Sequence, residues 1–282
     1  MTQVNIMTRE NMQTVQSGRW ALVTGASAGI GAEFCRQLAA QGYQLVLVAR
    51  REDKLKAIAD ELRESFGAHS LVIVADLSEK NASEAIVERL AQEHIDIEFL
   101  VNNAGYGLPG SFHVPGWQEH EDFIQVLLTA VCELTWRLLP GMRERGRGYI
   151  VNVASVAGLV SPTAGHTLYG ATKSFLIKFS QSLALENAES GVRVCALCPG
   201  FTYSEFHDVN GTREMVSQLP DYLWLQAKDV VADTMRAMFA RKFKPVLIPG
   251  GQYKVIVFME RYLPWLSAVF TRRAARKFRV TD

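Results

Sequence analysis

The sequence has few cysteines, little excess charge and no long apolar run. Four cysteines in 282 residues are too few for a disulfide scaffold. A formal net charge of +1 argues against a general nucleic-acid binder, which carries a basic excess. There is no uninterrupted apolar stretch long enough for a membrane-spanning helix, and the polar residues 1–17 do not resemble a signal peptide. With 48% hydrophobic residues, the chain is expected to be globular and cytoplasmic.

The cysteines are expected to be free thiols. Cys195 and Cys198 have a C-x-x-C spacing, but they lie in the run VRVCALCPG, which predicts a buried strand. Side chains three residues apart in a strand point to opposite faces of the sheet. No second cysteine pair or nearby histidine accompanies them, so no metal site is predicted and a reducing compartment is favoured.

Apolar strands alternate with helical patterns over residues 18–250. Continuous apolar runs such as LVLVA are typical of a parallel sheet with helices on both faces. The alternation predicts one α/β domain, a Rossmann-type doubly wound parallel sheet of about seven strands. Residues 1–17 are interpreted as a loose extension, and residues 251–282 as an extension on or near the substrate cleft. The expected strands are Trp20–Thr24, Gln44–Ala49, Leu71–Ala75, Ile97–Val101, Tyr149–Ala154, Val192–Leu197 and Pro245–Ile248; the expected helices are Gly31–Gln41, Asp53–Glu64, Ala82–Glu93, His120–Arg145, Tyr169–Ala188 and Ala227–Arg241.

The first expected strand leads into TGASAGIG (24–31) and then a helix. Glycines there let the backbone approach a pyrophosphate at the helix N-terminus, although three glycines also suit a simple tight turn. The position in a βαβ unit favours nucleotide binding. The second strand ends at Arg50 and Arg51, whose guanidinium groups suit the 2′-phosphate of NADP(H); the alternative is a solvated basic pair. Asp76 either meets the adenine or caps a turn.

Tyr169 and Lys173 form a Y-x-x-x-K pattern at the start of an expected helix. The i, i+4 spacing places both side chains on one helix face. A cation close to a phenol lowers its pKa toward the range of an acid/base catalyst. Ser155 follows the fifth strand and adds a hydroxyl at the same edge of the sheet, unless it only caps a turn.

Five motifs in this order resemble the short-chain dehydrogenase/reductase superfamily: TGASAGIG (24–31), NNAG (102–105), Ser155, YGATK (169–173) and CPG (198–200). The resemblance implies an NADP-preferring oxidoreductase. Tyr169 would exchange a proton with the substrate oxygen, Lys173 would bind the nicotinamide ribose, and Ser155 would hold the substrate oxygen. A homodimer or homotetramer is also expected. The implied cofactor-binding residues are Gly25, Ser27, Ala28, Gly29, Ile30, Gly31, Arg50, Arg51, Asp76, Leu77, Asn103, Ala104, Gly105, Tyr169, Lys173, Pro199, Gly200, Thr202 and Ser204.

One position departs from the family pattern. Leu127, in the stretch VLLTA (126–130), stands where the family usually has an asparagine that holds a water linking the lysine to solvent. A leucine side chain cannot hold that water. Either another route resupplies protons, or turnover is slow, or the protein is a cofactor-binding sensor or scaffold.

Two further segments bear on the substrate. The insertion 201–225 is rich in aromatic residues, which favours a hydrophobic carbonyl or alcohol, although half of these residues would serve equally well as core. In the tail, an apolar stretch precedes residues 272–282, which carry five basic residues against one acidic residue. We favour a helix that closes the cleft or contacts a subunit. The alternative is peripheral contact with an anionic membrane, which would suit a lipid-modifying reductase.

Overall fold

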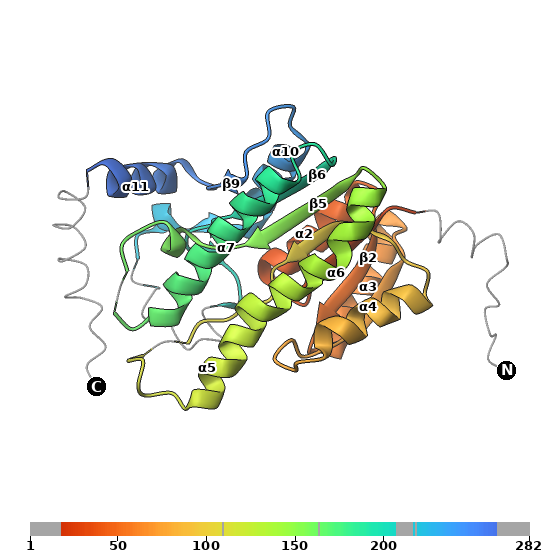
Figure 1. Ribbon diagram of the computed structural model, residues 1–282, viewed down its shortest axis with the longest axis horizontal. Coiled ribbons are helices and arrows are strands. Elements are labelled where there is room, and N and C mark those ends of the chain that lie inside the picture. Colours follow the sequence, from red (N-terminus) through yellow and green to blue (C-terminus); the bar gives the residue numbers. More distant parts are fainter. Residues whose placement is uncertain (1–17, 109, 163, 207–216, 218, 264–282) are drawn as a thin grey trace.

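The computed structural model describes residues 18–108, 110–162, 164–206, 217 and 219–263, so the expected extension 1–17 and the basic end of the tail lie outside the described residues. Within them, a seven-stranded sheet has the order β3-β2-β1-β4-β5-β6-β9, and every pair is parallel (Figure 1). The strands are β1 (Trp20–Thr24), β2 (Gln44–Ala49), β3 (Ser70–Val74), β4 (Ile97–Asn102), β5 (Gly148–Val153), β6 (Val192–Leu197) and β9 (Val246–Leu247).

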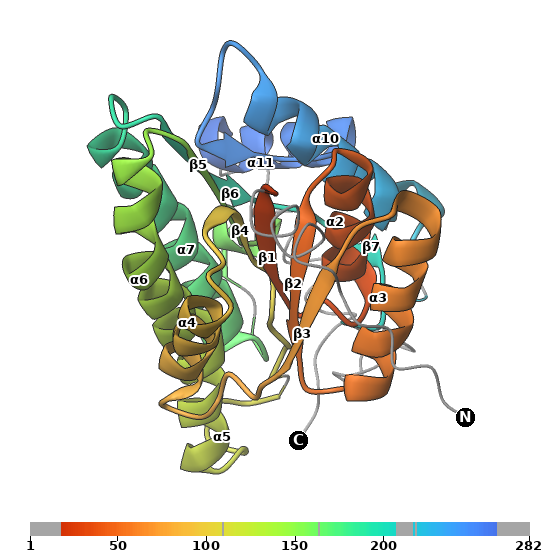
Figure 2. The same ribbon diagram turned by 90° about the vertical axis from the view of Figure 1, so that its right-hand side faces the viewer.

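Helices cover both faces of this sheet (Figure 2). Helices α2, α3 and α10 lie on one side, and α4, α6 and α7 lie on the other. This arrangement confirms the predicted doubly wound α/β fold. The helices are α2 (Gly29–Ala40), α3 (Glu52–Phe66), α4 (Ala82–Gln92), α5 (Trp117–Ile124), α6 (Ala130–Glu144), α7 (Thr167–Glu186), α10 (Ala227–Phe239) and α11 (Gly251–Tyr262).

The central strands are apolar at every position because both of their faces are covered. All five residues of β1 are buried. Ala21 and Val23 pack in the cluster that includes side chains of α2 and α3, whereas Trp20 and Leu22 pack in the cluster that includes α4 and α6. Since successive strand residues point to opposite faces, a doubly covered strand cannot alternate apolar with polar residues.

Two features of the chain were not predicted. The expected helix His120–Arg145 begins earlier, at Trp117, and a π-helical turn, Gln125–Thr129, separates α5 from α6. Such turns often occur at functional sites, and this one contains Leu127. The aromatic insertion also contains a small parallel sheet of β7 (Thr202–Tyr203) and β8 (Leu225–Gln226). Short two-residue strands leave no periodic signal in a sequence.

The helical stretch Trp117–Glu144 is long and apolar enough to cross a membrane by length and composition alone. The sequence predicts no membrane-spanning helix here, because polar residues interrupt the apolar run. Its side chains Leu127 and Leu134 are buried in the same cluster as Leu100 of β4 and Ile150 of β5. Core helices pass the same length and composition test, so this one is weak evidence for a membrane span.

A chain of buried polar side chains connects β4, β5, α6 and α7. The Asn102 amide donates to Asn152 Oδ1 at 2.8 Å and to Thr135 Oγ1 at 3.1 Å. The Asn152 amide donates to Ser180 Oγ at 2.9 Å, and that hydroxyl donates to the Leu176 carbonyl at 2.7 Å. Buried polar groups are costly unless they are paired, so these bonds fix the position of α7 relative to the strands.

Replacing Asn152 by alanine is expected to leave the Asn102 amide and the Ser180 hydroxyl short of a partner inside the core. We expect the free energy of unfolding to fall by about 2–4 kcal/mol, measured by urea denaturation. The control is Asn81→Ala, because Asn81 is exposed and makes no side-chain capping bond at the start of α4. An equal fall in the free energy of unfolding for the two variants would contradict a structural role for these buried hydrogen bonds.

Candidate active site

The glycine loop forms a cradle between β1 and α2. Gly25 and Gly29 have φ angles of +64° and +54°, in the left-handed region that favours glycine. A Cβ on Gly31 would lie only 2.2 Å from the Gly25 carbonyl oxygen and 2.5 Å from Asn103 Nδ2. The first turn of α2 carries no acidic residue, and Ala28 stands at its N-cap. A glycine-rich loop against a helix N-terminus fits the pyrophosphate of a dinucleotide.

Thr24 and Asn103 join the glycine loop to the end of β4. Thr24 Oγ1 accepts the backbone N–H groups of Asn103 at 2.9 Å and of Ala104 at 3.0 Å. The Asn103 amide donates in return to the carbonyls of Thr24, at 2.9 Å, and Gly25, at 3.2 Å. The predicted NNAG motif therefore lies directly beside the predicted glycine loop.

A group of cations lies at the end of β2 and the start of α3. Arg51 donates to Ser27 Oγ at 3.0 Å and pairs with Glu205 at 2.8 Å. Lys54 pairs with the other oxygen of Glu205 at 2.6 Å. Neither Lys54 nor Glu205 was predicted as a site residue. The position of Lys54, one helical turn beyond Arg50, was available in the sequence, whereas the approach of Glu205 across 151 residues was not.

Arg50 and Asp76 occupy more exposed positions at the same end. Arg50 lies 3.6 Å from an Asp76 oxygen and projects largely into solvent. The other Asp76 oxygen accepts the backbone N–H of Ser78 at 3.0 Å and its hydroxyl at 2.8 Å. Asp76 therefore caps the turn after β3, as in the second of the two readings of the sequence, while it remains next to Arg50.

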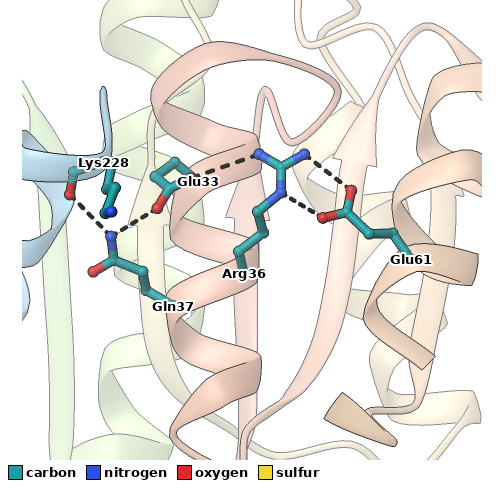
Figure 3. A network of polar contacts seen from close by, with 5 residues as sticks. All are labelled: Glu33, Arg36, Gln37, Glu61 and Lys228. Atoms are coloured by element: carbon teal, nitrogen blue, oxygen red, sulfur yellow. Dashed lines mark hydrogen bonds and ion pairs between the residues drawn. The ribbon is translucent and has the colours of Figure 1, made fainter. Parts of the chain in front are cut away.

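A hollow of about 630 Å³ lies between the glycine loop, α2, α3 and residues 203–205. Arg36 lines it but is already paired, because Glu61 accepts two of its N–H groups and Glu33 lies 3.6 Å away (Figure 3). Figure 3 also shows Gln37 linking Glu33 to the Lys228 carbonyl of α10. This network joins helices, and Arg51 and Lys54 supply the charge that faces Glu205.

The other predicted cofactor residues lie along the same edge of the sheet. Leu77 is buried among the apolar residues of the second core cluster, and Ile30 packs against the first. The Pro199 carbonyl accepts the N–H of Val156 at 3.0 Å, which holds the CPG motif against the Ser155 turn. The Thr202 hydroxyl donates to the Gly200 carbonyl at 3.0 Å, and Ser204 packs against Gly29 of the loop.

Ser155, Tyr169 and Lys173 come together as predicted. Ser155 caps a short turn after β5, where its Oγ accepts the Ala157 N–H at 3.1 Å and donates to the Pro199 carbonyl at 3.5 Å. The same hydroxyl lies close enough to Tyr169 to lower the pKa of its phenol. Tyr169 and Lys173 are one turn apart on α7. Lys173 Nζ donates to the Val153 carbonyl at 2.8 Å and lies 5.6 Å from the centre of the Tyr169 ring.

Burial moves both pKa values toward the neutral forms. It raises the pKa of Tyr169 to about 12, and the hydrogen bond with Ser155 offsets part of that rise. Burial lowers the pKa of Lys173 to about 8. The predicted lowering of the Tyr169 pKa by Lys173 stays a prediction. The ammonium is directed to the Val153 carbonyl, and Ser155 supplies the lowering interaction.

Leu127 lies beside the lysine at the π-helical turn. A Cβ on Gly105 would lie 3.6 Å from Leu127 Cγ and 3.9 Å from Lys173 Nζ, so the leucine and the ammonium flank the same backbone. Leu127 is 1% exposed. The departure seen in the sequence therefore places a buried apolar side chain next to the lysine.

The aromatic insertion divides into two parts. Phe206 lies next to Tyr169, with 5.9 Å between the centres of the two rings. Trp224 instead packs on Tyr203, at 4.7 Å, and on Phe201, at 5.8 Å. Some of the predicted pocket aromatics are therefore packed on one another.

Helix α11 contacts the aromatic insertion 201–225 and the loop that follows Ser155. The Tyr253 hydroxyl accepts the N–H of Phe201 at 2.9 Å and donates to the Leu223 carbonyl at 2.5 Å. Glu260 accepts the N–H of Ser161 at 2.8 Å.

All four cysteines are free, and Cys195 and Cys198 pack in different core clusters, as their spacing predicts. Among the residues that the structure describes, no group of three histidine, cysteine or acidic side chains is placed to hold a metal ion.

The fold and the site together define a dinucleotide-binding protein of the Rossmann type. More particularly, a family model described as short chain dehydrogenase matches residues 19–214, and the chain belongs to that family. Very-long-chain 3-oxoacyl-CoA reductase of Anas platyrhynchos is 37% identical over 199 residues, which are 68% of this chain and 62% of the relative. The 7beta-hydroxysteroid dehydrogenase of Collinsella aerofaciens is 32% identical over 203 residues, which are 72% of this chain and 73% of the relative. The match thus spans about three fifths of the reductase.

Solved structures are similar over more of the chain. A 7beta-hydroxysteroid dehydrogenase has a TM-score of 0.77 at 28% identity and covers 87% of this chain and 92% of its own. A short-chain dehydrogenase from Sphingobium yanoikuyae in complex with NADPH has a TM-score of 0.76 at 31% identity, with 94% and 96% covered. A family member from Burkholderia phymatum in complex with NAD, 24% identical with a TM-score of 0.77, covers 88% of this chain and 95% of its own and shows the fold alone.

Proposed function

We propose that the protein is an NADP(H)-dependent oxidoreductase that reduces the carbonyl of a hydrophobic substrate or oxidises the matching secondary alcohol. The observation that carries this proposal is the convergence of Ser155, Tyr169 and Lys173 beside the glycine cradle. Family membership and two relatives named as a 3-oxoacyl-CoA reductase and a hydroxysteroid dehydrogenase support it.

In this proposal the residues of the chain supply orientation and the proton. When bound, the nicotinamide supplies a hydride to the carbonyl carbon or accepts one from the alcohol. The Ser155 hydroxyl holds the substrate oxygen, and Tyr169 gives that oxygen a proton during reduction. Because burial raises the pKa of Tyr169 to about 12, its phenol is protonated at neutral pH and ready to donate. Lys173 donates to the Val153 carbonyl, and in this proposal it also binds the nicotinamide ribose.

The preference for NADP(H) rests on Lys54, which lines the hollow beside the glycine loop, and on Arg51, which pairs with the same carboxylate, with Arg50 close by. Guanidinium and ammonium groups suit a 2′-phosphate, whereas NAD-selecting sites place a carboxylate at the end of the second strand. The Sphingobium yanoikuyae neighbour, solved with NADPH, supports the same choice. A cytoplasmic location and a homodimer or homotetramer complete the proposal.

A broad panel of hydrophobic ketones, a hydroxysteroid-type ketone and a 3-oxoacyl-CoA tests this function through the absorbance of NADPH. The wild type is expected to turn over at least one of them, and Tyr169→Phe to lose at least about a hundredfold in kcat while it still binds NADPH. Leu127→Asn is assayed in parallel, because it restores a polar group next to Lys173.

If the wild type and Leu127→Asn both bind NADPH and neither turns over any ketone, the alternative holds, and the protein is a cofactor-binding sensor or scaffold. Faster turnover by Leu127→Asn than by the wild type would instead identify proton resupply as the limiting step.

The shifted pKa values of Tyr169 and Lys173 predict opposite pH dependences for carbonyl reduction and alcohol oxidation. Lys173 is charged below its pKa of about 8, so kcat for reduction should be level below about pH 8 and fall above it. Oxidation needs the Tyr169 phenolate, so its rate should rise toward alkaline pH. The profiles of kcat in both directions are the measurement, and Lys178→Met, at an exposed position of the same helix, is the control. A reduction rate that rises through pH 8 would contradict the assignment.

A second candidate is a membrane-peripheral, lipid-modifying reductase. Val255, Phe258 and Tyr262 of α11 each expose more than half of their surface. Helix α11 contacts the insertion 201–225 and the loop after Ser155, and the basic segment 272–282 follows it in the sequence. An exposed apolar helix face followed by basic residues suits an anionic membrane surface.

Cosedimentation with vesicles tests this candidate. The full chain is expected to pellet with phosphatidylserine-containing vesicles but not with phosphatidylcholine vesicles, and removal of residues 272–282 or Phe258→Ser should reduce pelleting. Trp136→Ser, which removes an exposed aromatic residue on α6, is the control. If sedimentation is the same with both kinds of vesicle and is unaffected by either the deletion or Phe258→Ser, the membrane proposal fails. Helix α11 is then a cleft or subunit contact.

A further inference from the structure

Residues 204–206 form a bridge across the cofactor groove. Ser204 packs on the glycine loop, since a Cβ on Gly29 would lie 2.8 Å from Ser204 Cβ. Glu205 reaches the cations of α3, and Phe206 lies against Tyr169. Three consecutive residues therefore contact the pyrophosphate cradle, the cation group and the catalytic tyrosine.

Glu205 divides its two oxygens between two cations. One oxygen lies 2.6 Å from Lys54 Nζ and the other lies 2.8 Å from Arg51 Nη1. The hydrogen bond from Lys54 and the ion pair with Arg51 hold the pKa of Glu205 below its usual range, so it is charged at neutral pH. The carboxylate thus uses the donors that a 2′-phosphate would need at this position.

This arrangement differs from the other ion pairs of the hollow. Arg36 is held by Glu61 and Glu33, which lie on the packed helices α2 and α3 (Figure 3). Glu205 instead comes from the segment after β6, so its carboxylate can leave the cations without disturbing a helix contact. Its side chain is also 42% exposed, which leaves room for it to turn toward solvent.

We propose that Glu205 is a specificity-determining residue that competes with the 2′-phosphate of the cofactor for Arg51 and Lys54, and so weakens the preference for NADP(H) over NAD(H). The proposal rests on the NADP(H) preference in the proposed function. A phosphate brings more charge and more acceptors than a carboxylate, so it displaces Glu205 at the cost of two ion pairs. Without the carboxylate that cost disappears, and the same cations meet the phosphate unopposed.

The test is binding of two adenosine probes, 2′,5′-ADP and 5′-AMP, by calorimetry, because they differ only in the 2′-phosphate. Glu205→Gln should bind 2′,5′-ADP about three- to tenfold more tightly than the wild type does, the size of a half-exposed ion pair, and 5′-AMP about equally. Glu52→Gln is the control. It removes one carboxylate next to Arg51, but that carboxylate pairs with Lys56 on the exposed side of α3.

The outcomes separate the two proposals. The preference is measured as the dissociation constant for 5′-AMP divided by that for 2′,5′-ADP. If Glu205→Gln leaves this ratio unchanged or lowers it, or if Glu52→Gln raises it equally, the role of Glu205 is overturned. If both the wild type and Glu205→Gln bind the probes equally well, the NADP(H) preference itself fails. If the wild type shows no preference and Glu205→Gln restores one, Glu205 has masked the site, and the proposal stands. Melting temperatures of the variants show that folding is unchanged, and no outcome depends on turnover.

Discussion

The reciprocal hydrogen bonds between Thr24 and Asn103 hold together the two strands from which the rest of the site is built. Strands β1 and β4 are neighbours in the sheet, and the strand order reverses between them. The crevice beyond the carboxyl ends of strands at such a reversal is where open α/β sheets bind ligands. Because Asn103 also donates to the Gly25 carbonyl, the same contact sets the shape of the glycine cradle. A Cβ on Gly25 or Gly31 would collide with Asn103, so the cradle and the connection depend on each other.

The catalytic helix is held by a second set of polar contacts, deeper in the sheet. The chain from Asn102 through Asn152 to Ser180 fixes α7 against β5, and α7 carries both Tyr169 and Lys173. Holding these groups in place requires burying them, and burial has a chemical consequence. It keeps the phenol protonated and makes the ammonium easier to deprotonate, so one packing arrangement sets the protonation of both groups.

Much of the fold and the catalytic group could be predicted from local patterns. The doubly covered strands are continuous apolar runs, and the i, i+4 spacing of Tyr169 and Lys173 survives in any helix. Lys54 could have been found by the same spacing from Arg50, but it reads as an ordinary solvated helix residue. The π-helical turn at Leu127 and the small sheet of β7 and β8 could not, because neither leaves a periodic signal in the sequence.

The sequence by itself determined the order of strands and helices, the glycines of the cradle and the choice of Ser155, Tyr169 and Lys173 as candidates, because each depends on neighbours within a few residues. Only the tertiary structure decided which charges meet. Glu205 reaches Lys54 from 151 positions away, and Lys173 turns to the Val153 carbonyl rather than to the phenol. Electrostatic pairing depends on distances of a few ångströms in space, and a parallel sheet sets those distances by bringing the ends of separate strands to one edge.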